Sequence, residues 1–91
     1  MKVRVIIHGV LIAETENPIM LEGNVYFPFQ DVRTEYLRPS DHHATCWWKG
    51  ETSYYHVEIG EEIDQNAAWY YPSPTKEAQF IKDYIAFERG L

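Results

Sequence analysis

The feature that most restricts the fold is a series of short apolar runs, each closed by a glycine or proline turn. At the amino terminus, Val3, Val5 and Ile7 recur at every second position, and the apolar run 10–13 resumes after His8-Gly9. Alternation with period two places these side chains on one face of a strand, and glycine supplies the positive φ of a tight turn. The pattern predicts a β-hairpin that turns at His8-Gly9 and packs its apolar face on the core.

Further extended runs follow along the chain. A second pair of strands, 19–21 and 25–27, is predicted around a glycine turn at 22–24. The later predicted strands are 45–49 and 52–59, joined at Gly50-Glu51, then 67–71 and a closing strand at 84–87. In the strand 52–59, alternation directs Val57 and Ile59 toward the core.

The segments between these strands are short and mostly polar. The stretch 29–37 has a loose spacing of four that suits one helical turn or an irregular crossover. A proline-marked loop is predicted at 38–43, and an acidic turn at 60–65. Ser73 or Thr75 is placed to cap a short helix over 76–81. The whole chain, 1–91, is therefore predicted to be a single domain, mainly antiparallel β with one or two short helices.

The net charge restricts the partners that we expect. Eight basic and fourteen acidic residues give a net charge of −6 at pH 7, and the basic residues are scattered along the chain. Binding to phosphates needs the opposite balance, so neither nucleic acid nor a membrane surface is an expected partner. The sequence shows no signal peptide and no membrane-spanning run, and its single cysteine, Cys46, forms no internal disulfide. These features predict a cytoplasmic protein.

Aromatic residues are concentrated in the second half of the chain. All three tryptophans and four of the seven tyrosines lie between Cys46 and Tyr71. A domain of 91 residues fully buries only a few such rings, so part of this surface is expected to line a groove or an interface. If the strands 45–49, 52–59 and 67–71 are neighbours, one ring of each adjacent pair fills the core, and the others gather on the opposite face.

Several pieces of the sequence, in their order, resemble a known family. They are Tyr26-Phe27-Pro28, Asp31-Val32, Pro39-Ser40-Asp41, Cys46 with Lys49-Gly50, Tyr54-Tyr55, Ala68-Trp69-Tyr70-Tyr71-Pro72 and Ala86-Phe87. From about Val3 to Phe87, the chain resembles a small bacterial family named domain of unknown function 427, which carries a nucleotidyltransferase-like label. The resemblance implies two antiparallel β-sheets in a tent-like or sandwich-like arrangement, similar to small domains that bind zinc through two pairs of cysteines. Because Cys46 is the only cysteine, no metal site is implied. The sequence shows neither the paired carboxylates nor the phosphate loop that nucleotidyl transfer requires.

Two groups of residues are candidates for catalysis, and each has a plainer alternative. A turn after Cys46 would bring Lys49 near the thiol and make it nucleophilic. Otherwise Cys46 is a small buried hydrophobe and Lys49 a cation that lies over an aromatic ring. His56 would act as a general base if Glu58, on the same strand face, reached its ring. Such a face is more often solvated, so no catalytic residue is assigned.

These patterns together predict a binding module with an aromatic pocket for a small planar, cationic or anionic ligand. The residues expected to bind the ligand are Cys46, Trp48, Lys49, Tyr54, His56, Trp69 and Tyr71. Trp69 and Tyr71 would form the walls of the pocket. Tyr54 and His56 would provide polar contacts, and Lys49 would attract an anionic group. No metal and no other cofactor are expected. Two alternatives stay open, namely an enzyme of nucleotide or metabolite chemistry that uses Cys46 or His56, and a protein-interaction or homodimerisation domain.

Overall fold

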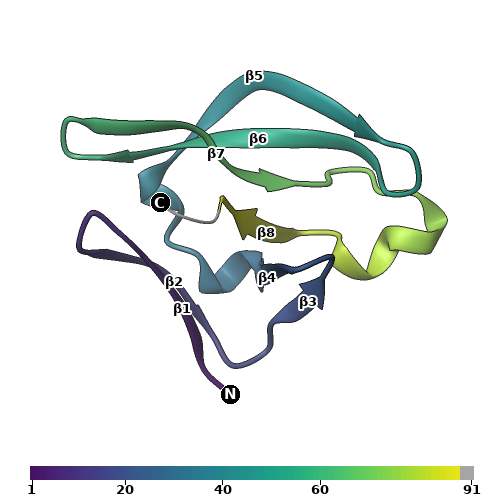
Figure 1. Ribbon diagram of the computed structural model, residues 1–91, viewed down its shortest axis with the longest axis horizontal. Coiled ribbons are helices and arrows are strands. Elements are labelled where there is room, and N and C mark those ends of the chain that lie inside the picture. Colours follow the sequence, from purple (N-terminus) through teal and green to yellow (C-terminus); the bar gives the residue numbers. More distant parts are fainter. Residues whose placement is uncertain (89–91) are drawn as a thin grey trace.

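Two antiparallel sheets form the fold in the computed structural model, which describes residues 1–88 (Figure 1). The smaller sheet is a hairpin of β1 (Val3–Ile7) and β2 (Val10–Thr15). The larger sheet has the strand order β3-β4-β8-β7-β6-β5. Its strands are β3 (Ile19–Leu21), β4 (Asn24–Pro28), β5 (Leu37–Cys46), β6 (Gly50–Ile59), β7 (Glu62–Tyr70) and β8 (Tyr84–Phe87). The predicted fold class, mainly β in two antiparallel sheets, is confirmed.

Both glycine turns near the amino terminus form as predicted. His8 and Gly9 have φ of 49° and 78°, and Glu22 and Gly23 have φ of 54° and 79°. Positive φ at both central residues is the geometry of the two-residue turn that matches the twist of a hairpin. These local turns join β1 to β2 and β3 to β4, and so set the register of the first half of the chain.

Three short 3₁₀ helices connect the strands of residues 1–88. They are η1 (Phe29–Asp31), η2 (Thr34–Tyr36) and η3 (Lys76–Ile81). The first two occupy the stretch 29–37, where helical turns were predicted, and η3 occupies the predicted short helix at 76–81. Within these described residues, no helix has the length and apolar character needed to cross a membrane.

The large sheet buries side chains on both of its faces. On one face, Phe27, Ile85 and Phe87 pack with Ile7 and Ile12 of the hairpin, and we name this cluster the intersheet core. The Phe27 and Phe87 rings meet edge to face, with their centroids 5.9 Å apart. Val57 is fully buried in the same core, as alternation in its strand predicts. The intersheet core therefore holds the two sheets together.

The opposite face of the large sheet carries a second cluster beneath η3. It consists of Tyr26, Tyr71, Ala78, Ile81 and Ala86, and we name it the helix-side core. Tyr26 and Phe27 are adjacent on β4 but belong to different cores, since successive side chains of a strand point to opposite faces. Most of the predicted binding residues lie around this second core.

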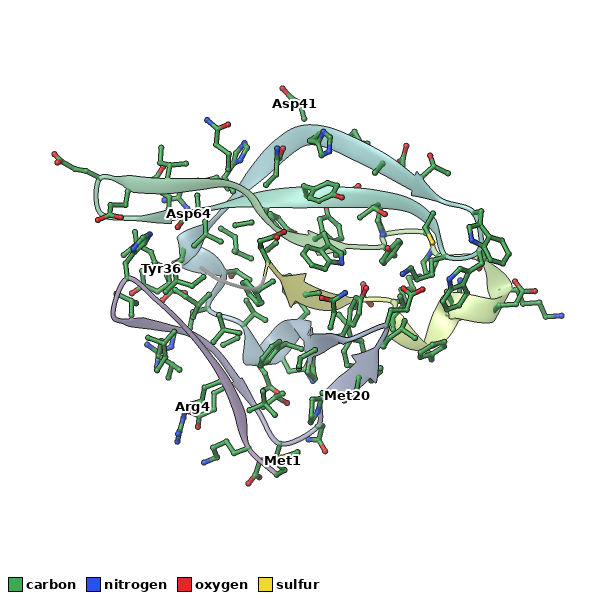
Figure 2. The ribbon with its side chains drawn as sticks, in the orientation of Figure 1. Met1, Arg4, Met20, Tyr36, Asp41 and Asp64 are labelled. Atoms are coloured by element: carbon green, nitrogen blue, oxygen red, sulfur yellow. The ribbon has the colours of Figure 1, made fainter. Side chains whose placement is uncertain are left out.

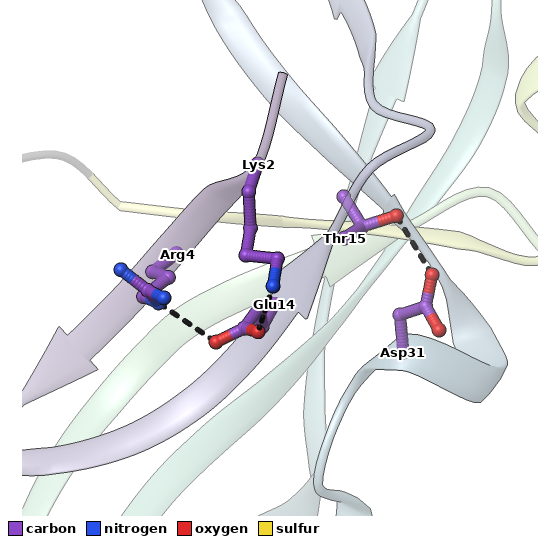
Figure 3. A network of polar contacts seen from close by, with 5 residues as sticks. All are labelled: Lys2, Arg4, Glu14, Thr15 and Asp31. Atoms are coloured by element: carbon purple, nitrogen blue, oxygen red, sulfur yellow. Dashed lines mark hydrogen bonds and ion pairs between the residues drawn. The ribbon is translucent and has the colours of Figure 1, made fainter.

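Polar contacts also fasten the hairpin to the rest of the molecule. Figure 3 shows Lys2, which precedes β1, and Arg4 of β1 on the carboxylate of Glu14 in β2, contacts that join the two strands of the hairpin. The Thr15 hydroxyl of β2 donates to Asp31 of η1 at 2.7 Å and so ties the hairpin to η1. At the other end of the hairpin, the two ring nitrogens of His8 contact carboxylates of β7, Glu62 at 3.1 Å and Asp64 at 2.8 Å. Both ends of the hairpin are thus tied to other elements.

Three predicted boundaries between residues 38 and 65 were wrong. The segment 38–43 is part of strand β5 and not a loop, and β7 begins at Glu62, within the predicted acidic turn. The turn between β5 and β6 is at Trp47–Lys49, so the predicted strand 45–49 ends at Cys46. β5 lies at the edge of the sheet, where one side of the ladder has no partner strand and polar residues and a proline are tolerated.

Candidate functional site

The turn between β5 and β6 is fastened to the segment that precedes η3. Cys46 pairs with Gly50, so Trp47–Lys49 project as a three-residue tip. The backbone N–H of Thr75 donates to the Lys49 carbonyl at 3.0 Å, and the Thr75 hydroxyl donates to the Trp48 carbonyl. The tip and the start of η3 therefore form one connected structure.

Gly50 permits this close approach. Its φ of 107° lies in the left-handed half of backbone space, and a Cβ atom built there would be 3.3 Å from the Ser73 carbonyl oxygen. Only glycine adopts this conformation in so confined a space without a large cost in free energy. The Gly50 of the Cys-x-x-Lys-Gly piece thus shapes the site without belonging to it.

Thr75 occupies the N-cap position of η3, as one of the two predicted candidates, but its side chain caps no N–H group of the helix. The hydroxyl is used by the Trp48 carbonyl instead. The prediction that the Thr75 side chain caps the helix was therefore wrong, because the hydroxyl binds the distant β5–β6 turn instead. Gln79 also supports this region, with its side-chain amide donating to the Pro74 carbonyl at 2.6 Å.

An open, largely apolar groove lies between the tip and η3. It is lined by Trp47, Trp48, Thr75 and Glu77 and has a volume of about 550 Å³. Trp47 is 90% exposed, which makes it the most exposed aromatic side chain in residues 1–88. Figure 2 shows aromatic rings gathered at this end of the molecule, where the β5–β6 turn approaches η3. We name this hollow the tryptophan groove.

A buried cation stands behind the tryptophan groove. Lys49 is only 6% exposed, and its ammonium forms an ion pair with Glu22 of the β3–β4 turn. The Nζ atom lies 5.4 Å from the Trp48 ring centroid and 5.3 Å from that of Tyr71, distances at which a cation is attracted to a ring face. The Trp48 indole N–H donates to the other carboxylate oxygen of Glu22 at 3.3 Å.

The charge state of this pair follows from its surroundings. Burial lowers the pKa of Lys49, but the hydrogen bond to Glu22 and the phenols of Tyr26 and Tyr71 outweigh it, so the pKa is raised above its ordinary value. The hydrogen bond from Lys49 lowers the pKa of Glu22. Lys49 is therefore charged at neutral pH, and its charge is balanced within the protein.

The predicted pocket walls lie deeper in the molecule. Tyr71 is 4% exposed and belongs to the helix-side core, against which Trp69 and Cys46 pack while half-buried. The Trp69 indole N–H donates to the hydroxyl of Tyr26 at 3.3 Å, and burial raises the pKa of Tyr26. Tyr54 pairs directly with Trp69 across β6 and β7.

Tyr54 continues the aromatic surface toward the edge of the sheet. Its ring lies 4.6 Å from the His42 ring of β5, centroid to centroid. Burial, together with Tyr71 and Glu88, raises the pKa of Tyr54, so its hydroxyl is protonated at neutral pH. The half-buried phenol is suited to hydrogen bonding and carries no charge.

His56 is separated from this group. It lies six positions after Gly50 on β6, roughly 20 Å from the tip at the rise of an extended strand. Its Nδ1 atom accepts the backbone N–H of Asn66 at 3.0 Å, at an irregularity in the pairing of β6 with β7. The carboxylate of Glu58 contacts Arg38 at 3.3 Å. In this structure, His56 therefore supports the β7 backbone, and Glu58 does not form the pair that a general base would need.

The structure thus brings five of the seven predicted residues around Lys49 and the helix-side core, with Tyr54 beside them and His56 apart. Whether these seven bind a ligand stays a prediction. In residues 1–88, no three side chains of histidine, cysteine, aspartate or glutamate are grouped closely enough to hold a metal ion. The sequence patterns did not identify Trp47, Thr75, Glu77 and Glu22 as residues of the site, because the contacts that bring them together join distant segments.

The comparisons with known proteins assign a family. The chain matches the model of the family described as Domain of unknown function (DUF427) over residues 1–90, and the name of that model carries the nucleotidyltransferase label. A search of curated proteins found no match. The family match covers nearly the whole sequence and agrees with the resemblance that the aromatic and glycine pieces indicate. The protein therefore belongs to the DUF427 family.

Proposed function

We propose that the protein is a non-catalytic binding module that holds a small planar or cationic ligand in the tryptophan groove. The observation that carries this proposal is the 90% exposure of Trp47 beside Trp48 in an apolar hollow. Two neighbouring indoles that form an apolar hollow edged by polar side chains are typical of a ligand or interaction site. The groove volume of about 550 Å³ is in the range of small-molecule sites, and indole rings offer flat surfaces for stacking.

The residues behind the groove support this proposal by making its wall rigid. Trp48 is held by the Thr75 hydroxyl at its carbonyl, by Glu22 at its indole N–H, and by Lys49 over its ring. A residue whose backbone is fixed at one point and whose ring is fixed at two loses little conformational entropy when a ligand stacks on it. In this proposal Trp48 contacts the ligand, and Cys46, Lys49, Trp69 and Tyr71 form the layer that supports it. Tyr54 lies beside that layer, and His56 takes no part because it is bonded to the β7 backbone farther along β6.

The proposal also includes a cytoplasmic location and excludes nucleic acid and membranes as partners. The net charge of −6 supports this, because a polyanionic surface would be repelled. A second copy of the chain is the competing occupant of the groove, since exposed tryptophan is also common at protein interfaces. Analytical ultracentrifugation separates the two, because self-association makes the sedimentation coefficient depend on concentration.

The test is an NMR titration of the indole N–H signals with a set of nucleobases, nucleosides and heteroaromatic metabolites. We expect at least one compound to shift the signals of Trp47 and Trp48, to raise the unfolding temperature, and to lose both effects in Trp47→Ala. The matched control is Phe29→Ala, which truncates another exposed ring outside the groove and should leave binding unchanged. A compound that binds Trp47→Ala as tightly as the wild type would refute the proposal.

A further inference from the structure

We propose that the ligand of the tryptophan groove carries a positive charge, as an organic cation whose charge is spread over methyl groups or a ring. This inference rests on the proposed function, because it names the ligand class of the same groove. It follows from the polar groups that line the groove, from the chemistry of its rings, and from the position of Lys49.

The polar side chains of the groove lining mainly offer hydrogen-bond acceptors. Glu77 contributes a carboxylate at the edge of the groove. The Thr75 hydroxyl uses its hydrogen for the Trp48 carbonyl, so its lone pairs remain for a ligand. The Trp48 indole N–H already donates to Glu22. The Trp47 indole N–H is therefore the hydrogen-bond donor that the lining side chains can offer a ligand. A carboxylate with acceptor oxygens beside it matches a cation and opposes an anion.

The rings provide a second attraction for a cation. The face of an indole is negative, and tryptophan is the strongest cation–π partner among the side chains. The Lys49 ammonium already lies over the rings of Trp48 and Tyr71, so the exposed Trp47 ring is the main cation–π partner for a ligand. The hydrogen bond from Trp48 to the Glu22 carboxylate polarises the indole further in the favourable direction.

Lys49 does not oppose such a ligand. Its charge is balanced by Glu22, and at 6% exposure it presents almost no surface to solvent. A bound anion would therefore gain little from Lys49 and would meet the Glu77 carboxylate. The net charge of −6 adds a long-range field that concentrates cations near the surface.

The experiment compares choline with its neutral isostere, in which carbon replaces the quaternary nitrogen, on the full chain at low salt. The indole N–H signals of Trp47 and Trp48 report binding of both compounds, which have nearly the same shape. We expect the dissociation constant of choline to be about tenfold lower than that of the isostere. We also expect Glu77→Gln to weaken choline binding about threefold and to leave neutral planar compounds unaffected. The matched control is Glu61→Gln, in the β6–β7 turn, which should change neither affinity.

The outcomes separate this inference from the function on which it rests. If neutral planar compounds shift the two indole signals but choline binds no more tightly than its isostere, or neither of the two binds, the groove does not select for positive charge and the cation inference is overturned. Equal choline affinity in Glu77→Gln and the wild type overturns the role of Glu77 and the inference with it. If neither cations nor neutral compounds shift the signals, the proposed function itself fails.

Discussion

Replacing Gly50 with alanine tests how the tryptophan groove is built. Gly50 has φ of 107°, and a Cβ atom there would lie 3.3 Å from the Ser73 carbonyl oxygen and 3.5 Å from the Thr75 nitrogen. Both neighbours are backbone atoms, so they cannot rotate away as a side chain would. Gly60 is the matched control, because its φ of 60° is also positive but its Cβ atom would have no neighbour within 4 Å.

The expected loss of stability follows from these two environments. In Gly60→Ala, only the left-handed backbone is penalised, by roughly 1 kcal/mol. In Gly50→Ala, the backbone strain costs about 1–3 kcal/mol, since 107° is outside the left-handed helical well. Moving segment 73–75 also weakens the two hydrogen bonds from Thr75, at about 0.5–1.5 kcal/mol each. The sum predicts a loss of about 2–6 kcal/mol for Gly50→Ala.

Urea denaturation, monitored by circular dichroism, measures both losses of stability, provided that the dependence of the unfolding free energy on urea concentration is the same in all variants. The indole N–H signals of Trp47 and Trp48 should shift in Gly50→Ala and stay in place in Gly60→Ala, because only the first change moves the wall of the groove. Equal destabilisation of the two variants, with unshifted indole signals, would show that the contact between the tip and segment 73–75 does not shape the groove.

Three further predictions concern the layer behind the groove. Trp69→Phe removes the donor to the buried Tyr26 hydroxyl and should lower the free energy of unfolding by about 1–2 kcal/mol; an unchanged melting curve would contradict this hydrogen bond. Because Lys49 lowers the pKa of Glu22, the ion pair stabilises the fold above the ordinary Glu22 value of 4.5, and this contribution is lost as pH falls through the lowered pKa. The stability difference between the wild type and Glu22→Gln should therefore shrink between about pH 7 and about pH 3, and a constant difference would exclude the linkage. Cys46 is half-buried against the helix-side core, so iodoacetamide should label the folded protein more slowly than the urea-unfolded chain; rapid labelling of the folded protein would favour the enzyme alternative.

Sequence patterns predicted the parts of the fold that depend on local contacts. The turns at His8-Gly9 and Glu22-Gly23 each combine a glycine with one other residue at positive φ, and the glycines and the apolar runs on either side are visible in the sequence. The burial of Val57 follows equally from alternation along one strand. The sequence also suggested that the aromatic-rich strands are neighbours, and β6 does lie between β5 and β7.

The features that were missed depend on contacts between distant segments. Pro39 and its polar neighbours are typical of a loop, yet they form an edge strand because β6 provides a ladder for them. Trp47 and Trp48 favour strands by intrinsic propensity, but the chain turns there because Thr75 binds the carbonyls of the tip. Nothing in the local sequence indicates that contact, and the groove that it creates was therefore not predicted.

The two edge strands of the large sheet affect how readily the protein aggregates at high concentration. β3 has three residues, and β5 carries Pro39 and loses its regular register between Pro39 and His43. Neither border offers the long, flat row of free amide groups on which another chain could nucleate fibril growth. The protein can thus display a bare indole to solvent while its sheet borders remain poor seeds for amyloid.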